Sequence, residues 1–320
     1  MRKIFKILGL LLVTIFSLAA CFLAFLFIHF PKTEPAAQIK IESTPARLAR
    51  GEYLFHHVVG CDICHSVRNF EIYGGPMTPG TEGAGGHFGS EEGLGTLYAP
   101  NITPYALASW SDGEIERALT SGVNKAGEPL FPIMPYERFA RLSQEDLYSI
   151  IVYLKTQKPI TNNVPRSRIE FPLSLIMRTI PEPAHPQANP KFAHRGEYLA
   201  NAASCIECHT PHDDHGKPIP GMMLAGGFEF HIPNHGTVRS VNLTPDPETG
   251  IGKWTKEDFV SRFERFASPE ASNIAVAKGS NNTVMPWFAF AGMSHEDLSD
   301  IYDFLRTVKP IKHSVEKFGK

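Results

Sequence analysis

The sequence repeats itself, and this repeat restricts the chain to folds in which one structural unit occurs twice. The segment Arg50–Leu54 (Arg-Gly-Glu-Tyr-Leu) recurs unchanged at residues 195–199, and further segments follow in the same order in both halves. These are Asn101-Ile-Thr-Pro with Asn242-Leu-Thr-Pro, Trp110 with Trp254, and Met134-Pro135 with Met285-Pro286. Such self-similarity indicates two copies of one unit. With 320 residues, the chain is long enough for two domains of ordinary size and a further segment.

Each copy carries the signals of helices joined by loops. A Ser or Thr followed three residues later by an acidic residue is the pattern of a helix N-cap. It occurs twice in each copy, at Ser111/Glu114, Ser143/Asp146, Thr255/Asp258 and Ser294/Asp297. Few segments alternate with a period of two, and Gly and Pro number 26 each. We therefore expect a mainly α fold with many loops and little sheet.

The N-terminal segment is typical of a membrane anchor. Arg2, Lys3 and Lys6 precede an almost unbroken apolar stretch from Ile7 to Phe30, which exceeds the roughly 20 residues that a helix needs to span a bilayer. A cleaved signal peptide usually has an apolar region of only about 7–15 residues. Because basic residues that flank a span tend to stay in the cytoplasm, we expect the rest of the chain on the opposite side of the membrane.

Cys21 leaves an alternative open for this segment. It follows Leu18-Ala-Ala, which is similar to a lipoprotein-processing box, but the sequence after Cys21 stays apolar where a lipoprotein would turn polar. An ordinary cysteine in a membrane helix is the interpretation that we favour. Lipidation of Cys21 would also tie the protein to a membrane.

These observations predict an N-terminal transmembrane helix followed by two tandem helical domains. The expected boundaries are an anchor over residues 1–30, a linker over 31–44, a first domain over 45–160, a proline-rich linker over 161–190 and a second domain over 191–320. Proline interrupts helical patterns repeatedly between 161 and 190.

Each copy contains one Cys-x-x-Cys-His motif, which is the attachment sequence of c-type haem. The motifs are Cys61-x-x-Cys64-His65 and Cys205-x-x-Cys208-His209. Two thiols three residues apart lie on one side of a helical turn, where both can form thioethers with the vinyl groups of one haem. The adjacent histidine can then bind the iron, and its other ring nitrogen should donate to a backbone carbonyl. We therefore predict two covalently attached haem c groups, with His65 and His209 as axial ligands.

Other uses of a Cys-x-x-Cys pair are less consistent with this sequence. A structural zinc site needs four ligands, and neither copy offers a second thiol pair. A thioredoxin-like redox pair needs a βαβ context, which the sequence does not show.

The repeat also selects a sixth ligand for each iron. Methionine sulfur is a usual sixth ligand where a relatively high reduction potential is needed. Met134 and Met285 occupy matching positions, each followed by Pro and an aromatic residue, whereas Met293 matches Leu142 and is expected to be a packing residue. We predict that Met134 and Met285 complete the two iron sites.

Four further residues are candidate haem contacts. Tyr136 and Trp287 directly follow the Met-Pro pairs, and we expect them to pack at the haem edge. Asn101 and Asn242 lie in turn-forming segments before a proline. They could bond to nearby backbone, as Asn does in many loops, or donate toward a haem propionate or the methionine segment, and the sequence favours neither role.

With these motifs assembled, both halves resemble class I cytochrome c domains, and they are similar to the cytochrome subunits of membrane-bound alcohol and aldehyde dehydrogenases. The resemblance rests on the Gly-Glu-Tyr-Leu, Cys-x-x-Cys-His, Asn-Ile/Leu-Thr-Pro and Met-Pro-aromatic segments, and it covers about residues 45–160 and 190–312. It implies a cytochrome c-like helical fold and low-spin His/Met ligation at His65/Met134 and His209/Met285. It also implies a bacterial inner-membrane protein with its haem domains in the periplasm.

The expected function is electron transfer between a periplasmic or membrane donor, such as a dehydrogenase subunit, and a respiratory acceptor such as a terminal oxidase. Filled axial positions favour a carrier, because they leave no open position on the iron for a substrate. The alternatives are a di-haem peroxidase, which needs one iron that can open, and a haem-based dehydrogenase of a small anion. The formal charge of −2 implies no strongly basic face, so nucleic acid is not expected as a partner.

Overall fold

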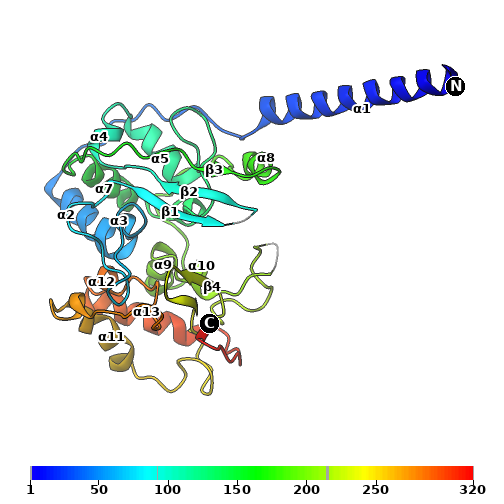
Figure 1. The fold of residues 1–320 in the computed structure, drawn as a ribbon. Coiled ribbons are helices and arrows are strands. Elements are labelled where there is room, and N and C mark those ends of the chain that lie inside the picture. The colour runs from blue at the N-terminus through cyan, green and yellow to red at the C-terminus, as the bar shows by residue number, and fades with distance from the viewer. Residues whose placement is uncertain (1, 92, 214–215, 320) are drawn as a thin grey trace.

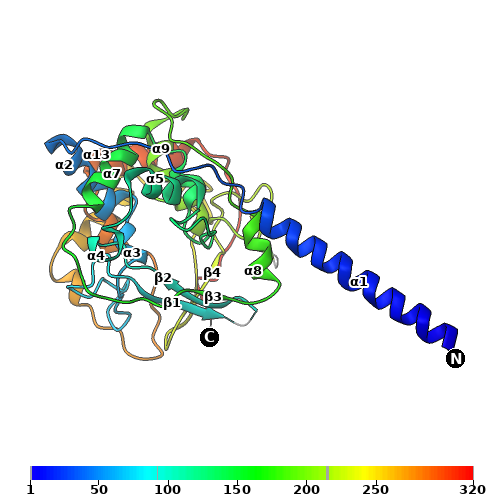
Figure 2. The ribbon, with the colours of Figure 1, turned by 90° about the horizontal axis from the view of Figure 1, so that it is seen from above.

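The computed structural model describes residues 2–91, 93–213 and 216–319 (Figure 1). Helix α1 (Arg2–His29) projects away from the rest of the chain in both ribbon views (Figures 1 and 2). In the described residues it is the one helix that is long and apolar enough to cross a membrane. The N-terminal apolar helix predicted from the sequence is therefore confirmed.

The main helices and strands after α1 follow a similar order in the two halves. The first half contains α2 (Pro45–Tyr53), a π-helical turn η1 (Leu54–Val58), α3 (Cys61–Cys64), β1 (Gly86–Glu91), β2 (Gly95–Ala99), α4 (Pro104–Leu107), α5 (Asp112–Ser121), α6 (Tyr136–Phe139) and α7 (Gln144–Leu154). The second half contains α9 (Arg195–Ala202), α10 (Cys205–His209), β4 (Glu229–Ile232), β5 (Gly236–Arg239), α11 (Lys256–Glu264), the 3-10 turns η3 (Arg265–Ala267) and η4 (Ala271–Asn273), α12 (Trp287–Phe290) and α13 (His295–Thr307). Helices hold 40% and strands 10% of the residues, which confirms a mainly helical fold with little sheet.

Each half carries a small antiparallel sheet whose third strand comes from the segment after the last helix. In the first half β3 (Arg168–Ile169) pairs with β2, and in the second half β6 (Phe318–Gly319) pairs with β5. The sheet orders are β1-β2-β3 and β4-β5-β6. Part of the segment expected to be a linker, which also contains α8 (Leu173–Ile176) and the 3-10 turn η2 (Met177–Thr179), thus adds a strand to the first half.

The helix starts predicted from the Ser/Thr-x-x-acid pattern are confirmed. Ser111 caps α5 and Thr255 caps α11, each in a reciprocal capping box with the acidic residue three positions on. Ser143 and Ser294 cap the last helices, α7 and α13, by accepting from the backbone N–H of Asp146 and Asp297. The side chains of Asp146 and Asp297 do not complete a capping box. They bind residues at the contact between the halves instead.

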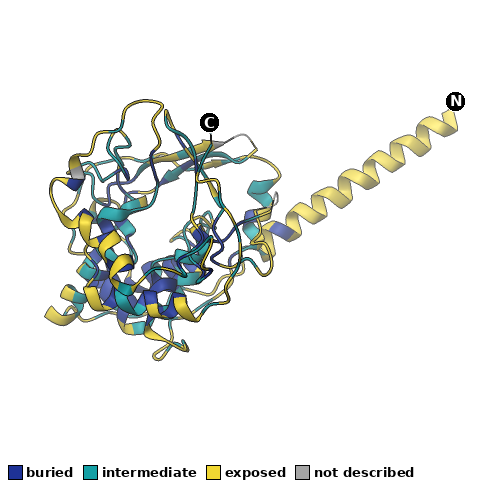
Figure 3. Cartoon of the chain, turned by 90° about the horizontal axis from the view of Figure 1, so that it is seen from below, coloured by how far each residue is buried: buried dark blue, intermediate teal, exposed yellow. Residues whose placement is uncertain are grey.

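Two glycines allow the first helix of each half to cross the last one closely. A Cβ atom on Gly51 would fall on the carbonyl oxygen of Ser149 in α7, and one on Gly196 would fall on that of Asp300 in α13. Buried residues from both crossings belong to one continuous apolar core, which includes Leu54, Leu147, Leu199 and Leu298. Figure 3 shows these buried helices gathered on one side of the molecule, whereas α1 is exposed along almost its whole length.

The π-helical turn η1 accommodates a difference in length between the copies. Cys61 follows Leu54 by seven positions, whereas Cys205 follows Leu199 by six. A single inserted residue in a helix is commonly absorbed as one π-helical turn. The insertion lies directly before the first Cys-x-x-Cys-His motif, and the motif still begins after a residue in the left-handed conformation, Gly60, as the second does after Ser204.

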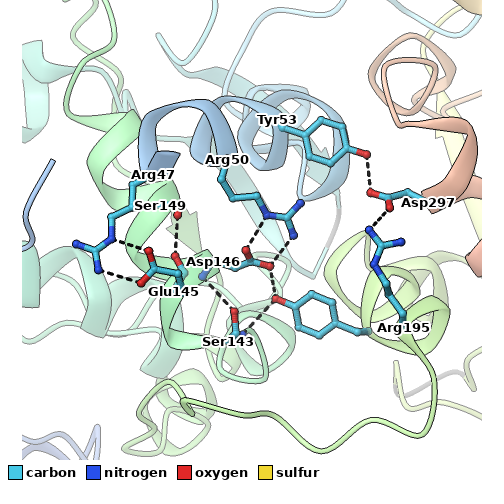
Figure 4. A network of polar contacts seen from close by, with 10 residues as sticks. Arg47, Arg50, Tyr53, Ser143, Glu145, Asp146, Ser149, Arg195 and Asp297 are labelled. Atoms are coloured by element: carbon cyan, nitrogen blue, oxygen red, sulfur yellow. Dashed lines mark hydrogen bonds and ion pairs between the residues drawn. The ribbon is translucent and has the colours of Figure 1, made fainter. Parts of the chain in front are cut away.

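The two halves contact each other through equivalent residues (Figure 4). The Tyr53 hydroxyl donates to Asp297 in α13, and the Tyr198 hydroxyl donates to Asp146 in α7, each over 2.6 Å. Arg50 pairs with Asp146 at 2.8 Å, and Arg195 pairs with Asp297. The Arg and Tyr of each Arg-Gly-Glu-Tyr-Leu segment thus bind different carboxylates, one in their own half and one in the other half. This reciprocity is the pattern of an isologous contact between two copies.

Candidate functional site

Both Cys-x-x-Cys-His motifs form a short helical turn. Cys61 and Cys64 lie one turn apart in α3, and Cys205 and Cys208 lie one turn apart in α10. All four thiols are free, with Cys64 and Cys208 exposed and the other two half-buried. Burial raises the pKa of the Cys205 thiol to about 12, so it is protonated at neutral pH.

The two histidines of these motifs are held in the same way. Nδ1 of His65 donates to the carbonyl oxygen of Pro100 over 2.7 Å, and Nδ1 of His209 donates to that of Val241 over 2.8 Å. Because a carbonyl only accepts, the proton resides on Nδ1, and Nε2 keeps its lone pair for a metal. Burial lowers the pKa of both imidazoles, which keeps them neutral. The expected bond from each histidine to a backbone carbonyl is therefore present.

The Met-Pro-aromatic segments adopt the same backbone turn. Pro135 (φ −81°, ψ 56°) and Pro286 (φ −81°, ψ 62°) have the dihedral angles of an inverse γ-turn. The N–H of Tyr136 donates to Met134 O, and the N–H of Trp287 donates to Met285 O, each over 2.8 Å. The two methionines are half-buried and pack against the apolar core, as Cys61 and Cys205 also do.

Asn101 and Asn242 are buried and fasten the chain that follows the last helix of each half. Nδ2 of Asn101 donates to Ile160 O, and Nδ2 of Asn242 donates to Ile311 O, each over 2.8 Å. The Oδ1 atom of each asparagine accepts from the backbone N–H and the hydroxyl of the threonine two residues on. The backbone role is thus seen at both positions, and a contact of either residue with haem stays a prediction.

The aromatic side chain after each methionine segment buries one polar atom. Among the described residues, Tyr136 Oη and Trp287 Nε1 are both buried without a hydrogen-bond acceptor. Since a buried donor is normally satisfied, these atoms fit a bound group that supplies an acceptor, as a haem propionate would. The free Nε2 of each histidine and the spacing of the thiols fit haem c as well. By contrast, the chain over 2–91, 93–213 and 216–319 shows no cluster of three or more His, Cys, Asp or Glu that would suit a metal ion alone.

Comparison with known proteins agrees with this chemistry. Residues 193–309 match the family model described as cytochrome c. These residues form a cytochrome c domain. It contains the motif Cys205–His209 together with Asn242 and Met285, and a cytochrome c domain implies covalently bound haem c.

The cytochrome c domain and the half that precedes it are both covered by similar proteins. The chain is 29% identical over 290 residues to the fructose dehydrogenase cytochrome subunit of Gluconobacter japonicus, which covers 83% of this chain and 54% of that protein. It is 27% identical over 293 residues to the gluconate 2-dehydrogenase cytochrome c subunit of Pantoea cypripedii, covering 85% of this chain and 62% of the relative. A diheme cytochrome c-type protein of Cereibacter sphaeroides is 33% identical over 118 residues, 37% of this chain and 36% of that protein. The chain thus spans less than two thirds of the length of these relatives.

One residue near both candidate iron sites could not be found by comparing the copies. Arg68 lies three positions after His65, and its guanidinium donates to the carbonyl oxygen of Val284, directly before Met285 in the other half, over 3.1 Å. The corresponding position after His209 is His212. Because Arg68 has no equivalent in the second copy, the repeat gives no signal for it.

Proposed function

We propose that this protein is a membrane-anchored electron carrier made of two tandem cytochrome c domains, with one covalently attached haem c in each. The proposed domains are residues 45–160 and 191–320, joined by the segment 161–190. The observation that carries the proposal is the equivalence of the two sites. Each has a Cys-x-x-Cys turn, a histidine fixed through Nδ1 and a methionine in the same inverse γ-turn.

A bound haem c would supply a one-electron couple, and the residues of each site would hold it for that purpose. Cys61 and Cys64 would form the thioethers in the first site, and Cys205 and Cys208 in the second. His65 and Met134 would bind one iron, and His209 and Met285 the other. Two such ligands would occupy both axial coordination positions of each iron. This supports electron transfer rather than binding of a substrate to the iron.

The two sites also contact each other directly. Arg138, four residues after Met134, forms an ion pair over 2.5 Å with Glu207, which lies inside the second Cys-x-x-Cys-His motif. This proximity supports the passage of electrons from one haem to the other within the protein.

We also propose the location and the partners. Helix α1 would span the bacterial inner membrane once, with the basic residues Arg2, Lys3 and Lys6 in the cytoplasm and the haem domains in the periplasm. The names of the relatives, which are cytochrome subunits of fructose, alcohol and gluconate dehydrogenases, support a membrane dehydrogenase subunit as the electron donor. A respiratory oxidase would be the acceptor.

Spectroscopy of the purified full-length protein tests this function. The pyridine haemochrome assay should give two haems c per chain, and electron paramagnetic resonance should show both irons low-spin. The reduced protein should be reoxidised slowly by hydrogen peroxide. A substantial high-spin signal together with rapid peroxide turnover would instead identify a peroxidase, and one haem per chain would contradict the two-site proposal.

A further inference from the structure

A loop of the first half covers the methionine segment of the second half. This bridging loop, residues 66–78, runs beside residues 274–284, where Tyr73 N–H donates to Ile274 O and Val276 N–H donates to Glu71 O, each over 2.8 Å. Asn282 is buried between them, and its Nδ2 donates to Phe70 O over 2.8 Å. The second methionine segment is therefore held by residues of both halves.

Arg68 connects the bridging loop to the chain directly before Met285. Its Nε donates to Gly75 O over 2.8 Å, and its Nη2 donates to Gly74 O over 2.5 Å. Nη2 also donates over 3.1 Å to the carbonyl oxygen of Val284, the residue directly before Met285. The guanidinium thus stabilises the turn of the bridging loop at Gly74 and Gly75. It also binds the backbone next to the proposed iron ligand Met285.

The guanidinium of Arg68 is bound by carbonyl oxygens and not by carboxylates of the described residues. Burial lowers the pKa of Arg68 to about 10, which leaves the side chain charged at neutral pH. Arg68 lies three residues after His65 and binds the carbonyl oxygen of the residue directly before Met285, so it is tied to both proposed iron sites.

We propose that Arg68 is an electrostatic positioning residue shared by both haem sites, an inference that rests on the proposed function. Its charge raises the reduction potential of both haems, and its bond to Val284 O holds the Met285 segment in place. The physical reason is that a haem gains an electron on reduction, so a fixed positive charge nearby stabilises the reduced form. The effect is larger in a partly buried site than in water, because the surroundings screen the charge less.

Reduction potentials of three variants test the proposal. The variant Arg68→Met removes the charge, Arg68→Lys keeps it without the planar fork of donors, and Arg166→Met removes a charge whose side chain is 82% exposed. Spectroelectrochemical titration of Arg68→Met should show both potentials lowered, by about a tenfold change in each reduction equilibrium, or about 59 mV for one electron. Arg68→Lys should keep both potentials closer to those of the unaltered protein, and Arg166→Met should change neither.

Two results would overturn the shared role. If Arg68→Met lowers only the potential of the haem bound by Met285, the residue merely supports that methionine segment. If Arg68→Lys lowers both potentials as much as Arg68→Met does, charge is not the cause. The variant Met134→Ala, which should shift the first haem alone, assigns each potential to its site. The unaltered protein is titrated in parallel, so a missing second haem or a high-spin iron would count against the proposed function and not against Arg68.

Discussion

The hydroxyl of Tyr53 donates to Oδ2 of Asp297 over 2.6 Å, although 244 positions separate the two residues in the sequence. The same hydroxyl accepts from the N–H of Ser294, the N-cap of α13, over 3.0 Å. Tyr198 makes the matching pair of bonds with Asp146 and Ser143 in the other half. Burial raises the pKa of both tyrosines, and the neighbouring carboxylate adds to the shift, so both remain protonated donors.

Replacing Tyr53 or Tyr198 with Phe should therefore loosen the contact between the halves. Each change removes a hydrogen bond to a charged group, and we expect the free energy of unfolding to fall by about 1.5–3 kcal/mol. Urea unfolding followed by circular dichroism measures this. The control is Tyr105→Phe, whose hydroxyl bonds to Asn163 on the surface and which should change stability by less than about 0.5 kcal/mol. Equal effects at Tyr53 and Tyr105 would show that the contact contributes little.

Replacing Met134 or Met285 with Ala should remove one iron ligand in each case. We expect each variant to lose about half of the methionine-to-iron charge-transfer band and to show a lowered potential at one haem. Absorption spectra and redox titration measure both. Met293→Ala is the matched control, since Met293 is 5% exposed and packs in the core. It should cost about 2–5 kcal/mol of stability without changing the band, and an unchanged band in the other two variants would show the ligand assignment to be wrong.

Replacing Asn101 or Asn242 with Ala should release the chain that follows the last helix of that half. The change removes the Nδ2 bond to the half-buried Ile160 O or Ile311 O, and it leaves the buried backbone N–H of the threonine two residues on without its acceptor. We expect a loss of about 1–3 kcal/mol. Hydrogen exchange of the Ile160 or Ile311 amide should become faster, because both amides bond to the threonine that the asparagine holds. Asn163→Ala, at an exposed position, serves as the control. Unchanged stability and exchange with an altered haem spectrum would instead indicate that the asparagines act on the haem.

Replacing Gly51 or Gly196 with Ala should force the first and last helices of one half apart. The added methyl group would overlap a backbone carbonyl, which cannot move without shifting the helix. Overpacking of this kind costs about 1–3 kcal/mol, and urea unfolding of the two variants measures it. Gly89→Ala is a suitable control because a Cβ atom there meets no atom within 4 Å. Similar stability of all three variants would show that the helices can separate without penalty.

Local features of the structure follow directly from sequence spacing. The capping pattern at Ser111/Glu114 and Thr255/Asp258, the Cys-x-x-Cys turns and the aromatic residue after each Met-Pro pair involve residues within about one helical turn of each other. Their geometry is set by the backbone of that turn, so type and spacing were sufficient to predict it. The repeat added the pairing of Met134 with Met285, because equivalent residues in two copies have equivalent neighbours.

The sequence by itself thus determined the apolar N-terminal helix, the helical character of the chain, the haem-attachment motifs and the candidate ligands. Only the tertiary structure decided which carboxylates Tyr53 and Tyr198 bind, that Asn101 and Asn242 fasten the segments after the last helices, and that Arg68 reaches Val284 O. These contacts join residues far apart in the sequence, and they depend on how the two halves dock. No local pattern records that docking, and for Arg68 the second copy offers no counterpart from which it could be inferred.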